Sequence, residues 1–228
     1  STLDRSSAAS DVYKRQILLS FRVSSMQTFV EIRDRSGSYS CKLANLDSLA
    51  ELLVRANLKE VFFNCAVSFP QPQSVRAFML ALKQRTKTNL VVAIHEYFLV
   101  CPSHFLLDDK GQYCGIPSVS RCNECLSNHP DGFVSLAGER SIERWREMWG
   151  ELLRAADEIR CFSTSSRTLL ERAYPGLGAR AKLSPHYVEP LREVSLPKQP
   201  QKYLTIGVIG AISHHKGAGV LELSLIHI

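Results

Sequence analysis

Features that would mark a membrane-spanning, disordered or fibrous protein are absent from this sequence of 228 residues. It has no apolar run of roughly 18 residues, the length that a helix needs to span a bilayer. It also has no internal repeat and no low-complexity tract. With 45% hydrophobic and 22% charged residues, its composition fits neither a disordered nor a fibrous class. We therefore expect a folded globular protein.

Charge of one sign is not concentrated anywhere along the chain. The formal net charge is +6, yet no run of five Lys or Arg residues occurs. Such a spread is typical of a solvated surface, although attraction to a phosphate-bearing substrate or to an anionic membrane also fits. Because the basic residues are not interleaved with aromatic residues in one patch, we expect no nucleic-acid partner.

Cysteine is too sparse for the disulfide framework of a small secreted protein. The seven cysteines are distributed over a chain long enough to bury a hydrophobic core. This usage favours a reducing, cytoplasmic compartment.

Two hexapeptides near the ends of the chain encode one DNA segment in opposite orientations. They are DVYKRQ at 11–16 and LSLIHI at 223–228. LSLIHI back-translates to CTG TCT CTT ATA CAC ATC, and the reverse complement of this DNA reads DVYKRQ. It resembles the transposon end sequence of sequencing-library adapters, so we interpret 1–16 and 223–228 as translated adapter. The genuine protein is then expected to be a fragment, cut at both ends.

Hydrophobic periodicity predicts alternating strands and helices. We expect strands at 28–34, 38–43, 61–67, 89–98, 159–163 and 203–210, and helices at 46–58, 74–85, 139–159 and 165–174. Asn45 is a plausible N-cap for the first helix. The apolar run LVVAI within 89–98 is typical of a parallel strand covered on both faces, which predicts a right-handed βαβ crossover. The helical spacing of Trp145 and Trp149 favours core packing over an aromatic binding stripe.

A segment rich in Pro and Lys at 189–202 marks a domain boundary. The expected fold class is therefore α/β. A Rossmann-like parallel-sheet domain occupies 17–188, and the first strand and helix start of a second Rossmann-like domain occupy 203–222. Ligands of such sheets bind beyond the carboxyl ends of the strands, and His95 follows one of these ends.

Three stretches in this order carry a family resemblance: NLVVAIHEYFLVCP, DEIRCFSTSSRTLLERAY and LTIGVIGAISHHKGAGVL. They resemble the GT-B glycosyltransferases of the large retaining family 4, and more closely the bacterial members that build surface polysaccharide. The resemblance covers most of 61–221. It implies transfer of a sugar from a nucleotide-sugar donor to a lipid-linked or polysaccharide acceptor, with no cofactor required for the chemistry. It also implies a place at the cytoplasmic face of the membrane, with peripheral membrane association.

The resemblance also assigns roles to individual residues. It places His95 near the transferred sugar as a hydrogen-bonding group, and Gly210, Lys216 and Gly217 in the segment that binds the donor diphosphate. A lysine beside a helix N-terminus has the right physics, because negative charge develops on the departing diphosphate. A structural histidine and an ordinary loop lysine are the alternative interpretations. Glu96 stands where the closest relatives often have Asp, and it receives no role.

The family's glycine-rich first loop and its downstream pair of glutamates are not in the sequence. We therefore expect the chain as it stands to be catalytically inactive, with any activity belonging to the intact parent enzyme. The family's serine-containing strand end falls at 163–165, where capping of the following helix is sufficient explanation.

A candidate metal site consists of Cys101, Cys114, Cys122 and Cys125, with His104 and His129 as substitute ligands. Only one close CxxC pair is present, so that structural zinc, reduced thiols and a disulfide or redox role all stay open. The loop at 99–132 follows the strand end that carries His95, and it is expected to border the acceptor side of the cleft.

Two other functions remain as alternatives to a glycosyltransferase. One is a zinc-containing, non-catalytic binding module centred on 95–132. The other is a different Rossmann-like sugar-nucleotide enzyme, such as an epimerase, which would share the α/β pattern.

Overall fold

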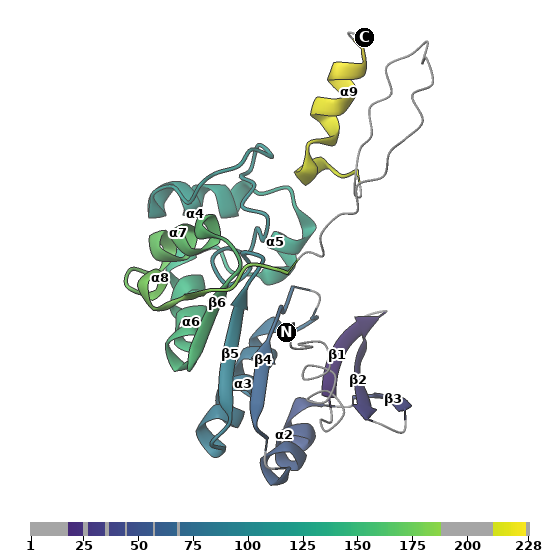
Figure 1. Ribbon diagram of the computed structural model, residues 1–228. Helices are drawn as coiled ribbons and strands as arrows, with labels where there is room; N and C mark the ends of the chain where they lie inside the picture. The colour runs from purple at the N-terminus through teal and green to yellow at the C-terminus, as the bar shows by residue number, and fades with distance from the viewer. Residues whose placement is uncertain are drawn as a thin grey trace, which may run out of the picture.

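The structure is a computed structural model that describes residues 18–24, 27–34, 37–43, 45–56, 58–67, 69–187 and 212–226. These residues form an α/β protein with one parallel sheet and one antiparallel sheet (Figure 1). The expected α/β class is therefore confirmed. The linker at 189–202 and the strand at 203–210 lie outside the described residues, and both stay predictions.

The antiparallel sheet comes first in the chain and has the order β1-β2-β3. Its strands are β1 (Leu18–Ser24), β2 (Gln27–Asp34) and β3 (Gly37–Lys42). The hairpin of β2 and β3 confirms the strands expected at 28–34 and 38–43. Every residue of β3 is exposed, whereas Val30 of β2 reaches the hydrophobic core.

The parallel sheet has the order β4-β5-β6-β7. Its strands are β4 (Glu60–Phe63), β5 (Asn89–Ile94), β6 (Glu158–Cys161) and β7 (Lys182–Leu183). Every residue of β5 after Asn89 is buried, as expected of an inner parallel strand covered on both faces. The helix between β4 and β5 supplies the expected βαβ connection.

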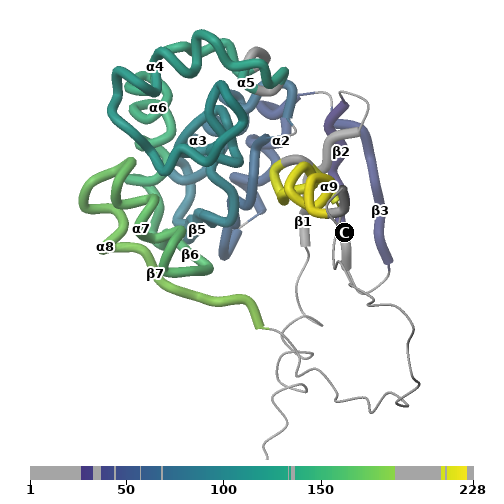
Figure 2. The backbone as a smooth tube through the Cα atoms, turned by 90° about the horizontal axis from the view of Figure 1, so that it is seen from above, coloured from purple at the N-terminus to yellow at the C-terminus, as the bar shows by residue number. Residues whose placement is uncertain are grey.

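Helices occupy most of the remaining described chain. They are α2 (Leu46–Arg55), α3 (Pro72–Arg85), α4 (Val119–Asn128), α5 (Gly132–Ala137), α6 (Ile142–Ala155), α7 (Thr164–Ala173), α8 (Leu177–Arg180), the 3-10 turn η1 (His214–Lys216) and α9 (Ala218–Ile226). α3 packs between α2 and α6. The antiparallel sheet lies on one flank of the molecule, and α4, α6, α7 and α8 lie on the other (Figure 2).

Local hydrogen bonds set where several of these elements begin and end. The side chain of Asn45 accepts from the amide of Ser48 at 2.8 Å, which confirms the expected N-cap of α2. α6 is shorter than the predicted 139–159, because Ser141 caps its start and the backbone becomes extended at Ala156. β5 ends at Ile94 instead of continuing to 98, because the chain turns at Glu96.

An aromatic cluster forms the centre of the core. Trp145 and Trp149 of α6 are both fully buried, and each packs against Phe98, with ring centroids 5.0 and 5.7 Å away. Phe63 of β4 packs against Trp149 at 6.0 Å. Buried aromatic side chains of this size dominate core energetics, so the core-packing interpretation of both tryptophans is confirmed.

Candidate functional site

The carboxyl ends of the four parallel strands meet at one edge of the sheet, because all four run in the same direction. The chain segments that leave this edge are 64–67 after β4, 95–98 after β5, 162–165 after β6 and 184–187 after β7. We call this the carboxyl edge. It is where ligands of open parallel sheets bind, and it contains His95, as the sequence predicts.

The turn after β5 is held by hydrogen bonds from distant side chains. The carbonyl oxygens of Phe98, Leu99 and Val100 accept from Trp145 Nε1 at 2.8 Å, from the hydroxyl of Tyr174, and from Arg146 Nε at 3.3 Å, respectively. Three successive backbone groups are thus paired with α6 and with the end of α7. His95 therefore stands beside a well-anchored turn.

His95 is exposed, and it contacts a phenyl ring that a second histidine also contacts. Its imidazole meets Phe162 edge-on, with centroids 6.3 Å apart and an interplanar angle of 77°. His186 stacks on the same phenyl ring at 4.3 Å and 4°. Burial, and then the proximity of His186, lower the pKa of His95. The neutral imidazole is thereby favoured at neutral pH, and it can both donate and accept hydrogen bonds.

Glu96 turns inward, away from the exposed carboxyl edge. Its Oε2 accepts from the amide of Phe98 at 2.5 Å, and its carboxyl is hydrogen-bonded to the thiol of Cys65 after β4. Burial raises the pKa of Glu96 to about 7, although both hydrogen bonds oppose this shift. Burial, and then the charge of Glu96, raise the pKa of Cys65 to about 11. Burial therefore favours the protonated forms of both groups.

The structure brings the four predicted cysteines of the metal site into one region. Cys122 and Cys125 are buried on α4, while Cys101 and Cys114 are packed against the same core. Burial raises the pKa of Cys101 to about 12, and the other three thiols add to this shift. All seven cysteines of the chain are free thiols.

These thiols do not make a metal site as they stand. Within the described residues, no three His, Cys, Asp or Glu side chains are grouped in a way that could hold a metal ion. Zinc needs thiolates, whereas burial raises the pKa of the Cys101, Cys122 and Cys125 thiols and so favours their protonated forms. His129 is not a free substitute ligand, because its Nε2 contacts the carbonyl of Leu107 at 2.9 Å and its Nδ1 accepts from the amide of Asp131 at 3.1 Å.

The loop that follows Cys101 is ordered by its own contacts. Asp108 accepts from the amides of Lys110 and Gln112, and Leu107 forms a β-bridge with Tyr113. Leu106 has a φ of 54° even though it is not glycine, and its side chain is buried in the core. Packing therefore holds a strained backbone in place next to the carboxyl edge.

Lys216 and Gly217 lie at the start of α9, as the sequence predicts. Lys216 ends η1, and Gly217 has a φ of 85°, which only glycine adopts easily. The amide of Ala218 donates to the carbonyl of Ser213 at 3.2 Å, so it is occupied within the turn. Gly210 lies outside the described residues. His215 stacks on Phe105 at 3.9 Å, which joins this turn to the loop after β5.

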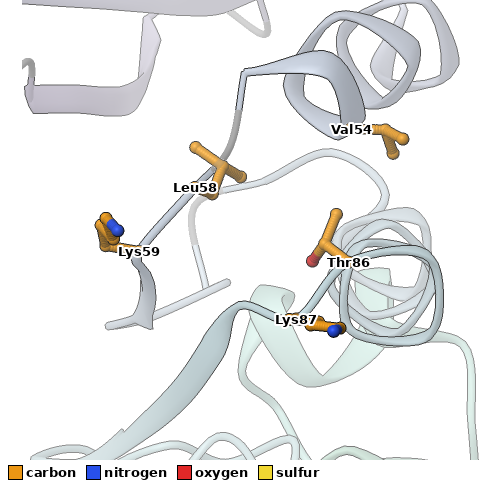
Figure 3. A pocket seen from close by; sticks show the side chains of 5 residues that line it. All are labelled: Val54, Leu58, Lys59, Thr86 and Lys87. Carbon is orange, nitrogen blue, oxygen red and sulfur yellow. The ribbon is translucent and has the colours of Figure 1, made fainter.

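A separate hollow lies at the opposite, amino end of the parallel sheet. It is lined by Val54, Leu58, Lys59, Thr86 and Lys87, which precede β4 and β5 or end the helices before them (Figure 3). It shares no residue with the carboxyl edge.

No family model matches the chain, and neither a curated protein nor a solved structure matches it. The glycosyltransferase resemblance therefore stays a prediction. In the described part of the chain, no helix has both the length and the apolar character that crossing a bilayer requires.

Three residues of the carboxyl edge were not anticipated from the sequence: Cys65, Phe162 and His186. Each follows a different strand of the sheet. Phe162 contacts His95, Cys65 pairs with Glu96, and His186 stacks on Phe162, and all three contacts arise only after the chain has folded. A signal existed for Phe162, because it lies near the end of the strand predicted at 159–163, at the same edge as His95. His186 lies in an irregular segment without periodicity, so nothing local distinguishes it.

Proposed function

We propose that this chain is part of a retaining, GT-B type glycosyltransferase that moves a sugar from a nucleotide-sugar donor to a lipid-linked or polysaccharide acceptor. The observation that carries the proposal is the position of His95. It follows the inner strand β5, it is exposed at the carboxyl edge, and the turn beside it is anchored by α6 and Tyr174. The enzyme would work at the cytoplasmic face of the membrane.

The chemistry of glycosyl transfer fits the residues around this edge. The neutral imidazole that burial favours at His95 can hydrogen-bond a sugar hydroxyl without adding a fixed charge. Lys216 is exposed beside the start of α9, where a cation and a helix N-terminus would stabilise the departing diphosphate. The stacking of His215 on Phe105 supports a common site, because it joins the loop of Lys216 to the loop after β5.

The decisive experiment is to sequence the source DNA across both adapter junctions and to assay the recovered protein. A glycine-rich loop upstream and a pair of glutamates downstream of α9 would support the proposal. In that protein, we expect His95→Ala and Lys216→Ala to lower kcat by about a hundredfold or more, because each removes a group that acts where charge develops. Lys87→Ala, at the opposite end of the sheet, is the matched control. A recovered protein without donor hydrolysis or transfer would overturn the proposal.

The proximity of the four thiols favours one other candidate, a zinc-containing binding module. It requires the side chains to rearrange, because the described residues contain no ready metal group. Metal analysis of the purified chain tests it, with Cys122→Ser/Cys125→Ser as the comparison. Stoichiometric zinc that is lost in the variant would favour the binding module, whereas zinc-free, folded protein would exclude it.

A further inference from the structure

We propose that His95 and His186 together form a binding site for a phosphate group at the carboxyl edge of the parallel sheet. Three neighbouring strands bring the site together: His95 follows β5, Phe162 follows β6, and His186 lies shortly after β7. Phe162 contacts both imidazoles, because His186 stacks on its ring with centroids 4.3 Å apart and His95 meets it edge-on at 6.3 Å. The phenyl ring thus serves as the support of the site.

Both imidazoles are available to a ligand. Each histidine is exposed, and within the described chain neither ring makes a hydrogen bond or an ion pair with protein. The rings are nevertheless held by aromatic contacts, so that little side-chain freedom is lost when a ligand binds. A neutral imidazole offers one N–H to a phosphate oxygen, and the negative charge of a bound phosphate favours uptake of a second proton by the ring.

The surroundings favour an anion. Among the segments that leave the carboxyl edge (64–67, 95–98, 162–165 and 184–187), Glu96 is the only acidic residue. Its carboxyl is turned inward to the amide of Phe98, and burial favours its neutral form. The N-terminus of α7 begins directly after Phe162, with Ser163 as its cap, and its dipole adds positive potential.

The phosphate could belong to an acceptor or to a nucleotide donor, and the chemistry that the histidines recognise is the same. This proposal deepens the proposed function. Only the biological identity of the ligand depends on that function. Binding by the present chain can be measured without any transferase activity. Failure of phosphate binding and failure of the glycosyltransferase assignment are therefore separate results.

The test is calorimetric titration of the whole 228-residue chain with three probes: inorganic pyrophosphate, geranyl diphosphate and uridine diphosphate. We expect binding of at least one probe. His186→Phe retains the ring that stacks on Phe162 but removes both nitrogens, and we expect about tenfold weaker binding, the usual loss for a charge-assisted hydrogen bond. His95→Gln should weaken binding similarly. Lys87→Gln, which removes a positive charge at the opposite end of the sheet, should bind as the unchanged protein does.

The pattern across probes identifies the source of the phosphate. Preference for geranyl diphosphate supports an acceptor with a prenyl chain, preference for uridine diphosphate supports a nucleotide, and equal binding supports recognition of the phosphate alone. The proposal is overturned if no probe binds to the folded chain, or if His186→Phe binds as tightly as the unchanged protein. Because both histidines are exposed, the variants are expected to fold, and circular dichroism checks this.

Discussion

Glu96 and Cys65 form a buried acid and thiol pair behind the carboxyl edge. A carboxyl with a pKa raised to about 7 is neutral in the folded protein under conditions in which the unfolded chain is ionised. Its hydrogen bond from the amide of Phe98 still shapes the turn after β5. The residue therefore has a structural task and also makes stability depend on pH.

The sign of this dependence follows from the direction of the shift. The raised pKa of Glu96 leaves stability fully present below the ordinary carboxyl value of 4.5 and removes it as pH rises toward about 7. The loss amounts to about 3 kcal/mol at most, from the size of the shift. We expect the free energy of unfolding of Glu96→Gln to change much less between about pH 5 and about pH 8 than that of the unchanged chain. Urea denaturation at both pH values measures this, and parallel losses in the two proteins would contradict it.

At the scale of elements, α6 does more than fill the core. One of its two buried tryptophans, Trp145, donates to the carbonyl of Phe98 at 2.8 Å, whereas the indole nitrogen of Trp149 has no hydrogen-bond partner among the described residues. The two side chains are equally buried and lie one helical turn apart. They form a natural matched pair for measuring how strongly α6 anchors the turn.

We expect Trp145→Phe to lower the free energy of unfolding by about 1–3 kcal/mol more than Trp149→Phe. Both variants lose similar volume, but only the first leaves a buried carbonyl without its donor. Chemical denaturation of the two variants gives the difference directly. Equal destabilisation would mean that the hydrogen bond contributes nothing beyond packing.

The N-terminus of α7 carries a capping box at the carboxyl edge. Ser163 Oγ accepts from the amide of Ser166 at 3.0 Å, and the hydroxyl of Ser166 accepts from the amide of Ser163 at 3.2 Å. We expect Ser163→Ala to cost about 1 kcal/mol, because an N-terminal amide of the helix loses its partner. Ser165→Ala, in the same exposed turn, is the control and should be nearly neutral in thermal unfolding. A loss in the control as large as that in Ser163→Ala would refute the capping argument.

At the scale of the whole molecule, the described core ends well before the end of the chain. The last member of the hydrophobic cluster is Ala181. Val220 and Leu223 of α9 are 69% and 62% exposed, so they contribute little apolar burial. α9 continues into 223–226, which we interpret as translated adapter. A helix is possible there because a leucine-rich segment has adequate helix propensity.

A chain that ends at Tyr187 should therefore unfold at nearly the same temperature as the full chain. A chain that ends at Tyr174 provides the comparison, because it also loses β7 and the buried residues Leu177 and Ala181. We expect this second truncation to cost at least about 2 kcal/mol, from the loss of apolar burial. Calorimetric melting of both truncated chains and of the full chain measures the two losses of stability. A large destabilisation of the Tyr187 truncation would show that 188–228 belongs to the same cooperative unit.

Much of the fold was predictable because its signals are local. The buried run of β5, the N-cap at Asn45 and the core tryptophans of α6 each depend on residues a few positions apart. His95 was predictable as an edge residue for the same reason, since it directly follows the apolar run LVVAI. Element bounds were predicted less well, because the hydrogen bonds of Glu96 and Ser141 decide where strand β5 ends and where helix α6 begins.

The sequence by itself thus determined the class of fold, most of the strands and helices between residues 28 and 174, and the edge at which His95 stands. Only the tertiary structure decided what surrounds that histidine. Phe162 contacts it from the segment after β6, His186 stacks on that same phenyl ring, and Trp145 anchors the turn from α6. These contacts join residues far apart in the chain, so they have no periodicity that a sequence pattern could reveal. They exist because the parallel strands place their carboxyl ends side by side.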